Sequence, residues 1–134
     1  MEYAYVFSLA LIFGGMMAFQ LLFAPLLFIK LEMAIARKFI RAFFPFYYLY
    51  FGFLTVLACG ASYSLNYNLA TVTLFTCTLG FLVSRQILMP MANAATDAAN
   101  KARFDLSHRL TVLINTVQLI AVTYLLCMVI QQIK

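Results

Sequence analysis

The stretch that decides the fold runs from Ala42 to Ser84 and reads AFFPFYYLYFGFLTVLACGASYSLNYNLATVTLFTCTLGFLVS. It contains no aspartate, glutamate, lysine or arginine over 43 residues. One straight helix of that length would measure roughly 64 Å, about twice the hydrocarbon thickness of a bilayer. We therefore expect two membrane spans, at about 42–62 and 69–89, joined by the polar turn from Ser62 to Asn68.

Two more tracts without these charges flank this pair, from Tyr3 to Ile29 and from Leu110 to Ile133. Each is longer than the roughly 20 residues that a helix needs to span a bilayer. Because lipid offers no partners to backbone polar groups, such spans must be helical. The sequence predicts an all-α, single-domain integral membrane four-helix bundle, with spans at about 3–29, 42–62, 69–89 and 110–133. The first apolar run is too long for a signal peptide and lacks a basic start, so we expect it to stay uncleaved.

The composition of the whole chain agrees with this class. Of the 134 residues, 66% are apolar and 10% are charged, which excludes an ordinary soluble domain. Eight of the nine basic residues fall in the two segments that follow the first and third spans. The positive-inside rule places those segments in the cytoplasm and both termini on the non-cytoplasmic side of the cell inner membrane. The net charge of +5 is then explained by topology, so we expect the lipid bilayer, and no nucleic acid, as a partner.

The second basic segment carries most of the functional information. Pro90 suits the first turn of a helix, the following run is rich in alanine, and charged side chains recur every fourth residue from Asp97. The pattern predicts an extra cytoplasmic interfacial helix over about 91–105. If this helix continues into the fourth span, one polar stripe enters the membrane and should face the bundle interior. The stripe consists of Asp97, Lys101, Phe104, His108, Thr111, Asn115 and Gln118.

Polar residues near the cytoplasmic ends of the other spans can join this stripe. The candidate cluster consists of Gln20, Arg85, Asn93, Asp97, His108 and Asn115. Its functional interpretation is a small-solute or proton site. Its structural interpretation is that these side chains satisfy one another and fix the register of the helices.

Several of these residues belong to a pattern that resembles a known family. Its elements are FAPLLF at residues 23–28, FFPFYY at 43–48, and the segment from Asp97 through Ser107-His-Arg109 to Asn115. The chain resembles the small four-helix membrane family catalogued as a domain of unknown function, which includes an animal transmembrane protein linked to platinum-drug resistance. The resemblance covers most of the chain and implies no established activity. The positions it marks are Pro25, Pro45, Tyr48, Arg85, Asn93, Asp97, His108 and Asn115.

The residue types limit the chemistry. The one histidine and three scattered cysteines do not make a metal site, and no nucleophile triad, phosphate-binding loop or carboxylate pair is present. We expect no enzyme and no cofactor. The first functional hypothesis is handling of a small solute or ion at the polar cluster, by a homo-oligomer. The alternative is an accessory or assembly subunit of a larger membrane complex. A further alternative is a haem- or porphyrin-related membrane protein, in which His108 ligates alone or across a dimer.

Overall fold

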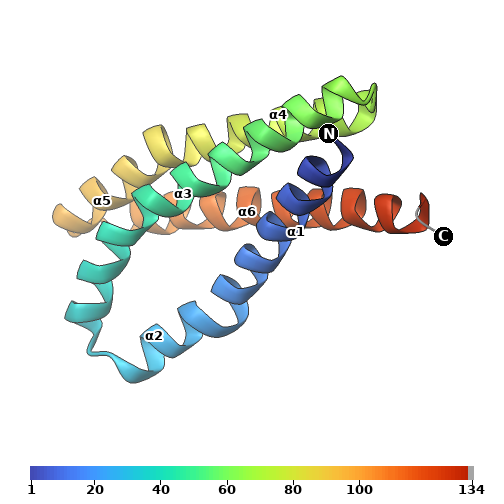
Figure 1. The fold of residues 1–134 in the computed structure, drawn as a ribbon. Coiled ribbons are helices and arrows are strands. Elements are labelled where there is room, and N and C mark those ends of the chain that lie inside the picture. Colours follow the sequence, from blue (N-terminus) through green and yellow to red (C-terminus); the bar gives the residue numbers. More distant parts are fainter. Residues whose placement is uncertain (133–134) are drawn as a thin grey trace.

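A computed structural model describes residues 1–132 of the chain. All regular structure in those residues is helical, and Figure 1 shows the helices arranged as an elongated bundle. Four continuous helical stretches are long and apolar enough to cross a membrane, which confirms the prediction of an all-α chain with four such helices. The elements are α1 (Glu2–Ala18), η1 (Phe19–Phe23), α2 (Ala24–Lys30), α3 (Met33–Ser64), α4 (Asn68–Val83), η2 (Ser84–Leu88), α5 (Met89–Asp97) and α6 (Lys101–Gln132).

The helices extend beyond the predicted spans at the basic end of the bundle. α3 begins at Met33 and α6 begins at Lys101, each about nine residues before the expected boundary. Helices satisfy their own backbone groups in water as well as in lipid, so a change from apolar to charged side chains does not end them. At the opposite end α3 runs to Ser64, and Asn66 makes the tight turn to α4 with a φ of 60°, which asparagine tolerates better than most residues.

The predicted helix over about 91–105 is not a single element. Its first half is α5, which continues α4 through η2, and its second half is the first turn of α6. The break falls at Ala99, whose φ of 51° is left-handed. Asn100 then caps α6, because its side-chain oxygen accepts a hydrogen bond from the backbone N–H of Arg103 at 3.1 Å. Because the helix breaks at Ala99, the predicted polar stripe is interrupted between Asp97 and Lys101.

Two π-helical turns, η1 and η2, interrupt the first and third long helices. In η1 the backbone N–H of Ala24 donates to the carbonyl of Phe19, and in η2 that of Met89 donates to Ser84. Each π turn begins six residues before a proline, Pro25 or Pro90. A proline inside a helix lacks an N–H and crowds the carbonyl four residues earlier, and a π turn accommodates both defects.

The chain consists of two helical hairpins, residues 2–64 and 68–132, that repeat the same plan. Each has an apolar helix with a π turn, a short basic-end connection, and a long helix of 32 residues. The buried positions recur as well. The first arms share four buried positions with the same spacing, which are Tyr5, Leu9, Ile12 and Met16 in α1 and Ala70, Leu74, Cys77 and Phe81 in α4. The long arms also share four, which are Phe51, Thr55, Ala58 and Ser62 in α3 and Gln118, Val122, Leu125 and Val129 in α6.

The two hairpins differ in how closely their arms approach at the basic end. α5 packs along α6, whereas α2 diverges from α3 (Figure 1). The side chains explain the difference. Aromatic rings stand between α3 and η1, just before α2, where the ring of Phe23 lies 5.2 Å from that of Phe43 and 5.7 Å from that of Phe39. α5 instead presents small side chains such as Ala95, which is 2% exposed.

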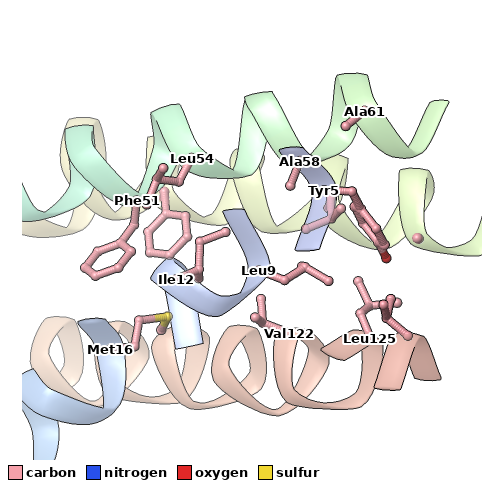
Figure 2. Close-up of a cluster of buried hydrophobic side chains, with 14 of the residues drawn as sticks. Tyr5, Leu9, Ile12, Met16, Phe51, Leu54, Ala58, Ala61, Val122 and Leu125 are labelled. Atoms are coloured by element: carbon pink, nitrogen blue, oxygen red, sulfur yellow. The ribbon is translucent and has the colours of Figure 1, made fainter. Parts of the chain in front are cut away.

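The apolar core lies where α1 crosses α3 and α6. Figure 2 shows Leu9 and Ile12 of α1 pointing between Phe51 of α3 and Val122 of α6. Hydroxyl pairs join the next interface, between α3 and α4: Ser62 contacts Thr71 at 3.0 Å, and Thr78 donates to Thr55 at 3.0 Å. Because most hydroxyls also donate to their own helix, these polar groups stay satisfied inside an apolar bundle.

Candidate functional site

The six residues of the predicted polar cluster do not meet. Gln20 lies in η1, Arg85 in η2, Asn93 and Asp97 in α5, and His108 and Asn115 in α6. Over residues 1–132 no hydrogen bond or ion pair joins any two of the six side chains. Three of them, Arg85, Asp97 and Asn115, instead bond to residues of another helix outside the predicted set, and these contacts link the helices pairwise.

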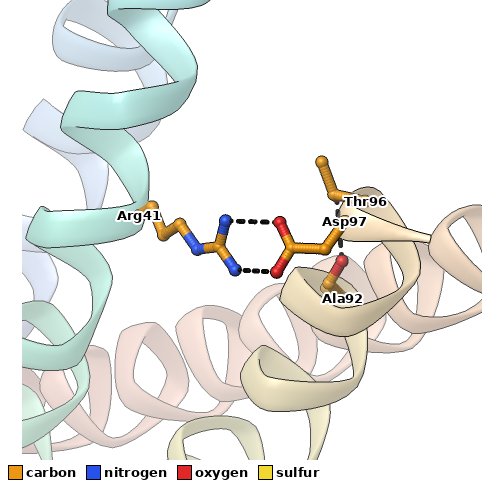
Figure 3. Close-up of polar contacts among 4 residues, drawn as sticks. All are labelled: Arg41, Ala92, Thr96 and Asp97. Carbon is orange, nitrogen blue, oxygen red and sulfur yellow. Dashed lines mark hydrogen bonds and ion pairs between the residues drawn. The ribbon is translucent and has the colours of Figure 1, made fainter. Parts of the chain in front are cut away.

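Asp97 forms an ion pair with Arg41 of α3 (Figure 3). Both terminal nitrogens of the guanidinium donate to the carboxylate, at 2.8 and 2.6 Å, so the contact is bidentate. The side chains are 46% and 61% exposed, and both lie outside the spans predicted over 42–62 and 69–89. The hydrogen bonds from Arg41 lower the pKa of the Asp97 carboxyl. Sequence reasoning missed this pair because its members are 56 positions apart.

The two amides of the α6 stripe face the bundle interior, as predicted. Asn115 accepts a hydrogen bond from the hydroxyl of Tyr47 in α3 at 3.3 Å. Gln118 is 4% exposed and donates to the backbone carbonyl of Cys77 in α4 at 2.8 Å. Gly80 makes room for that amide, because a Cβ there would lie 2.6 Å from the Gln118 nitrogen. The stripe therefore fastens α6 to both α3 and α4.

His108 lies apart from these contacts. Its side chain is exposed, and its ring stacks on that of Phe104 one turn earlier, with centroids 5.7 Å apart and planes inclined by 7°. Neither Arg85 nor Asp97 contacts it through a hydrogen bond or ion pair. His108 is therefore not joined to the other members of the candidate cluster, and the helix breaks between Asp97 and Lys101.

Arg85 is half-buried in η2, inside the span predicted over 69–89. Its Nε donates to the backbone carbonyl of Pro45 in α3 at 3.3 Å. No carboxylate lies within ion-pair distance of its guanidinium in the described part of the chain, where the one ion pair is that of Arg41 and Asp97. Arg85 thus links η2 to α3 and retains an uncompensated charge.

An aromatic cluster fills the interface between η1 and α3. Phe19 stacks on Phe43 with centroids 5.5 Å apart and lies 4.9 Å from the ring of Tyr47. Beside this cluster is an open apolar groove of about 300 Å³. It is lined by Gly15, Phe19, Phe43, Phe46, Tyr47, Tyr50 and Phe51. The sequence did not predict this cluster, since a helix pattern does not show which rings from different helices will meet.

A row of small residues on α1 lies next to the groove. Ala10, Gly14 and Ala18 recur every fourth residue, and all three are exposed. A Cβ on Gly14 would have no neighbour within 4 Å, whereas one on Gly15 would lie 2.8 Å from the Phe51 ring. α1 therefore presents a row of small residues to the outside, flanked by the exposed side chains of Phe7 and Leu11, and a second small position to the core.

For residues 1–132 the structure contains no group of three histidine, cysteine or carboxylate side chains that could hold a metal ion. The three cysteines are free thiols. Comparison with protein families, with curated protein sequences and with solved structures finds no match for this chain. Its resemblance to the four-helix family of unknown function therefore stays a prediction from the residues.

Proposed function

We propose that this chain is a four-span inner-membrane protein that serves as an accessory or assembly subunit of a larger membrane complex. Its partner is a transmembrane helix of another protein, which packs along the small-residue face of α1 and against the aromatic residues of α3. The observation that carries the proposal is the pairing of an exposed row, Ala10, Gly14 and Ala18, with the adjacent groove.

The chemistry of that surface suits a helix. Association of helices in lipid depends on close backbone approach, which small residues every fourth position permit. The exposed side chains of Phe46, Tyr50 and Phe53 form a bulky ridge on α3. A helix lying on α1 beside Gly14 can insert its side chains between this ridge and the neighbouring Gly15, which lines the open groove. Such a fit gains van der Waals contact that fluid acyl chains provide less well.

The internal polar contacts support the same proposal. Asn115, Gln118, Thr55 and Thr78 bond to neighbouring helices within the bundle. Interhelical bonds of this kind stabilise the arrangement of spans rather than offering groups to a solute. A small-solute role centred on Asn115 is the second candidate, and the long 3.3 Å bond from Tyr47, which also lines the groove, favours it.

Site-specific photocrosslinking in the native membrane tests the proposal. A photoreactive residue at Leu11, which flanks the small row, should crosslink to one integral membrane protein identified by peptide mass. Gly14→Leu should abolish that crosslink by blocking close approach. Gly60→Leu is the matched control, because Gly60 is another exposed glycine with no neighbour within 4 Å of a Cβ. Crosslinking only to lipid, or only to a second copy of the chain, would contradict the accessory-subunit proposal.

A further inference from the structure

The charge of Arg85 has no acidic partner among residues 1–132. The chain contains four acidic residues, and over residues 1–132 only Asp97 forms an ion pair, with Arg41. The guanidinium of Arg85 makes one hydrogen bond to the protein, from Nε to the carbonyl of Pro45. Its two terminal amino groups make none within those residues. A cation in an apolar setting is costly unless an anion or several acceptors compensate it.

The location of Arg85 makes the compensating group predictable. It lies in η2, four residues before the end of the span predicted over 69–89, at the end of the bundle that carries the basic segments. The side chain is half-buried, so it is accessible from outside the bundle while its Nε is fixed by Pro45. π turns of this kind often occur at functional positions. A guanidinium fixed at Nε presents its two terminal amino groups as a fork, the geometry that binds a phosphate through two parallel hydrogen bonds.

We propose that Arg85 binds a phosphate-class anion at the basic end of the bundle, held by its terminal amino groups beside η2. A phosphate can come from an anionic lipid headgroup at this depth of the membrane or from a free phosphate in solution. The other hairpin provides an internal comparison, because the corresponding π-turn position is Gln20, which carries no charge. The site therefore belongs to the second hairpin alone.

Lipid retention measured by native mass spectrometry tests this site. The purified full-length protein is titrated with phosphatidylglycerol, with phosphatidylcholine and with inorganic phosphate in separate experiments. Wild-type protein should retain the anionic lipid, and Arg85→Gln should lower the affinity about tenfold or more, as expected for loss of a charge-assisted bidentate contact. Arg85→Lys should bind with intermediate affinity, since it keeps the charge without the fork. Arg103→Gln, which removes an exposed arginine of the same end, should change the affinity less than about twofold.

The experiment separates the two sources of phosphate. Retention of phosphatidylglycerol that depends on Arg85 supports a lipid headgroup, and inorganic phosphate binding with the same dependence supports a free anion. Equal binding by wild type and Arg85→Gln in both titrations would overturn the proposal. If Arg85→Gln fails to fold, arginine-selective modification of the wild-type protein replaces it. Phosphatidylglycerol or phosphate should then protect Arg85 but not Arg103, and protection of neither residue would overturn the site.

Discussion

At the scale of single residues, two glycines set the distance between neighbouring helices. Gly15 receives the ring of Phe51 and Gly80 receives the amide of Gln118, at 2.8 and 2.6 Å from the position of a Cβ. Both contacts join the first arm of a hairpin to its long arm, and they occupy equivalent places in the two hairpins. Gly14, one residue away, has no such neighbour. Adjacent glycines in α1 therefore have different roles.

Gly80→Ala should destabilise the protein by about 1–3 kcal/mol, the usual cost of overpacking. The added methyl group would displace the Gln118 amide and weaken its bond to the Cys77 carbonyl. Gly14→Ala should be neutral or stabilise by up to about 1 kcal/mol, because it adds helix propensity in open space. Reversible unfolding in detergent measures both. Equal effects of the two substitutions would show that backbone propensity, not the close contact, decides the outcome.

The ion pair of Arg41 and Asp97 should have a defined pH dependence. Because Arg41 lowers the native pKa of Asp97, the contribution of the pair is complete above the ordinary carboxyl pKa of about 4. It is lost as the pH falls through the lowered native pKa. Asp97→Asn should therefore lower the Tm by a small, constant amount from neutral pH down to about 4, and by less below that. Asp105→Asn is the charge-matched control, and a Tm difference that grows toward acid pH would contradict the assignment.

The residue types of the polar contacts could be predicted, but their partners could not. Asn115 and Gln118 follow the helical period and were placed correctly on an inward face. The partner of Asp97 depends on where the first turns of α3 lie relative to α5, and the two residues are 56 positions apart. The break at Ala99 and Asn100 also decided which groups could reach His108. The alanines favour a continuous helix, but the chain breaks there and Asn100 caps the new helix α6.

At the scale of elements, the apolar tracts predicted the four long helices well, because each tract is long enough for one helix that could cross a bilayer. The helix ends were harder to predict, since charged residues 33–41 and 101–109 remain helical. The π turns have a partial signal in Pro25 and Pro90. Pro45 also lies inside a helix, but no π turn precedes it. Proline alone therefore does not predict whether the helix adapts by a π turn.

Deleting one residue from a π turn should be tolerated. A π turn holds one residue more than an α-helical turn, so removing exposed Leu22 from η1 restores an α-helix and keeps the downstream side chains in register. Deleting Leu11, which is also exposed, should unfold the protein, because it rotates Ile12 and Met16 relative to the residues before them. Size-exclusion elution and Tm in detergent measure the outcome. Equal loss of folded protein in both deletions would contradict this role of η1.

At the scale of the whole molecule, the repeated hairpins share one orientation. Both connections between the arms lie at the basic end, and the α3–α4 turn lies at the other. The aromatic rings between η1 and α3 distinguish the first hairpin, and Phe19, Phe43 and Tyr47 among them line the groove. The lengths of the uncharged tracts predicted the number of spans but not this asymmetry. It arises from the size of side chains on two helices that meet only after folding.

The basic segments predict the direction of insertion. Eight of nine lysines and arginines lie at one end, so that end should face the cytoplasm and both termini should face away from it. A reporter that is active only in the cytoplasm, fused after residue 134, should be silent. The same reporter inserted after Asn100, in the connection between α5 and α6, should be active. The reverse pattern would invert the bundle and place Arg85 at the opposite leaflet.

The start of α1, the turn around Asn66 and the last turns of α6 lie at one end of the bundle, where Tyr5, Tyr67 and Val129 line a common pocket. A gene cut at Asn66 would therefore yield two polypeptides, each a hairpin with its own backbone bonds complete. Co-expressed fragments 1–65 and 66–134 should copurify through a tag on either one. Fragments produced by a cut inside α6, after Ile120, should not copurify. That cut separates the second hairpin from most of the buried face of α6, which carries Val122 and Leu125. The chain can thus be divided once without losing its architecture.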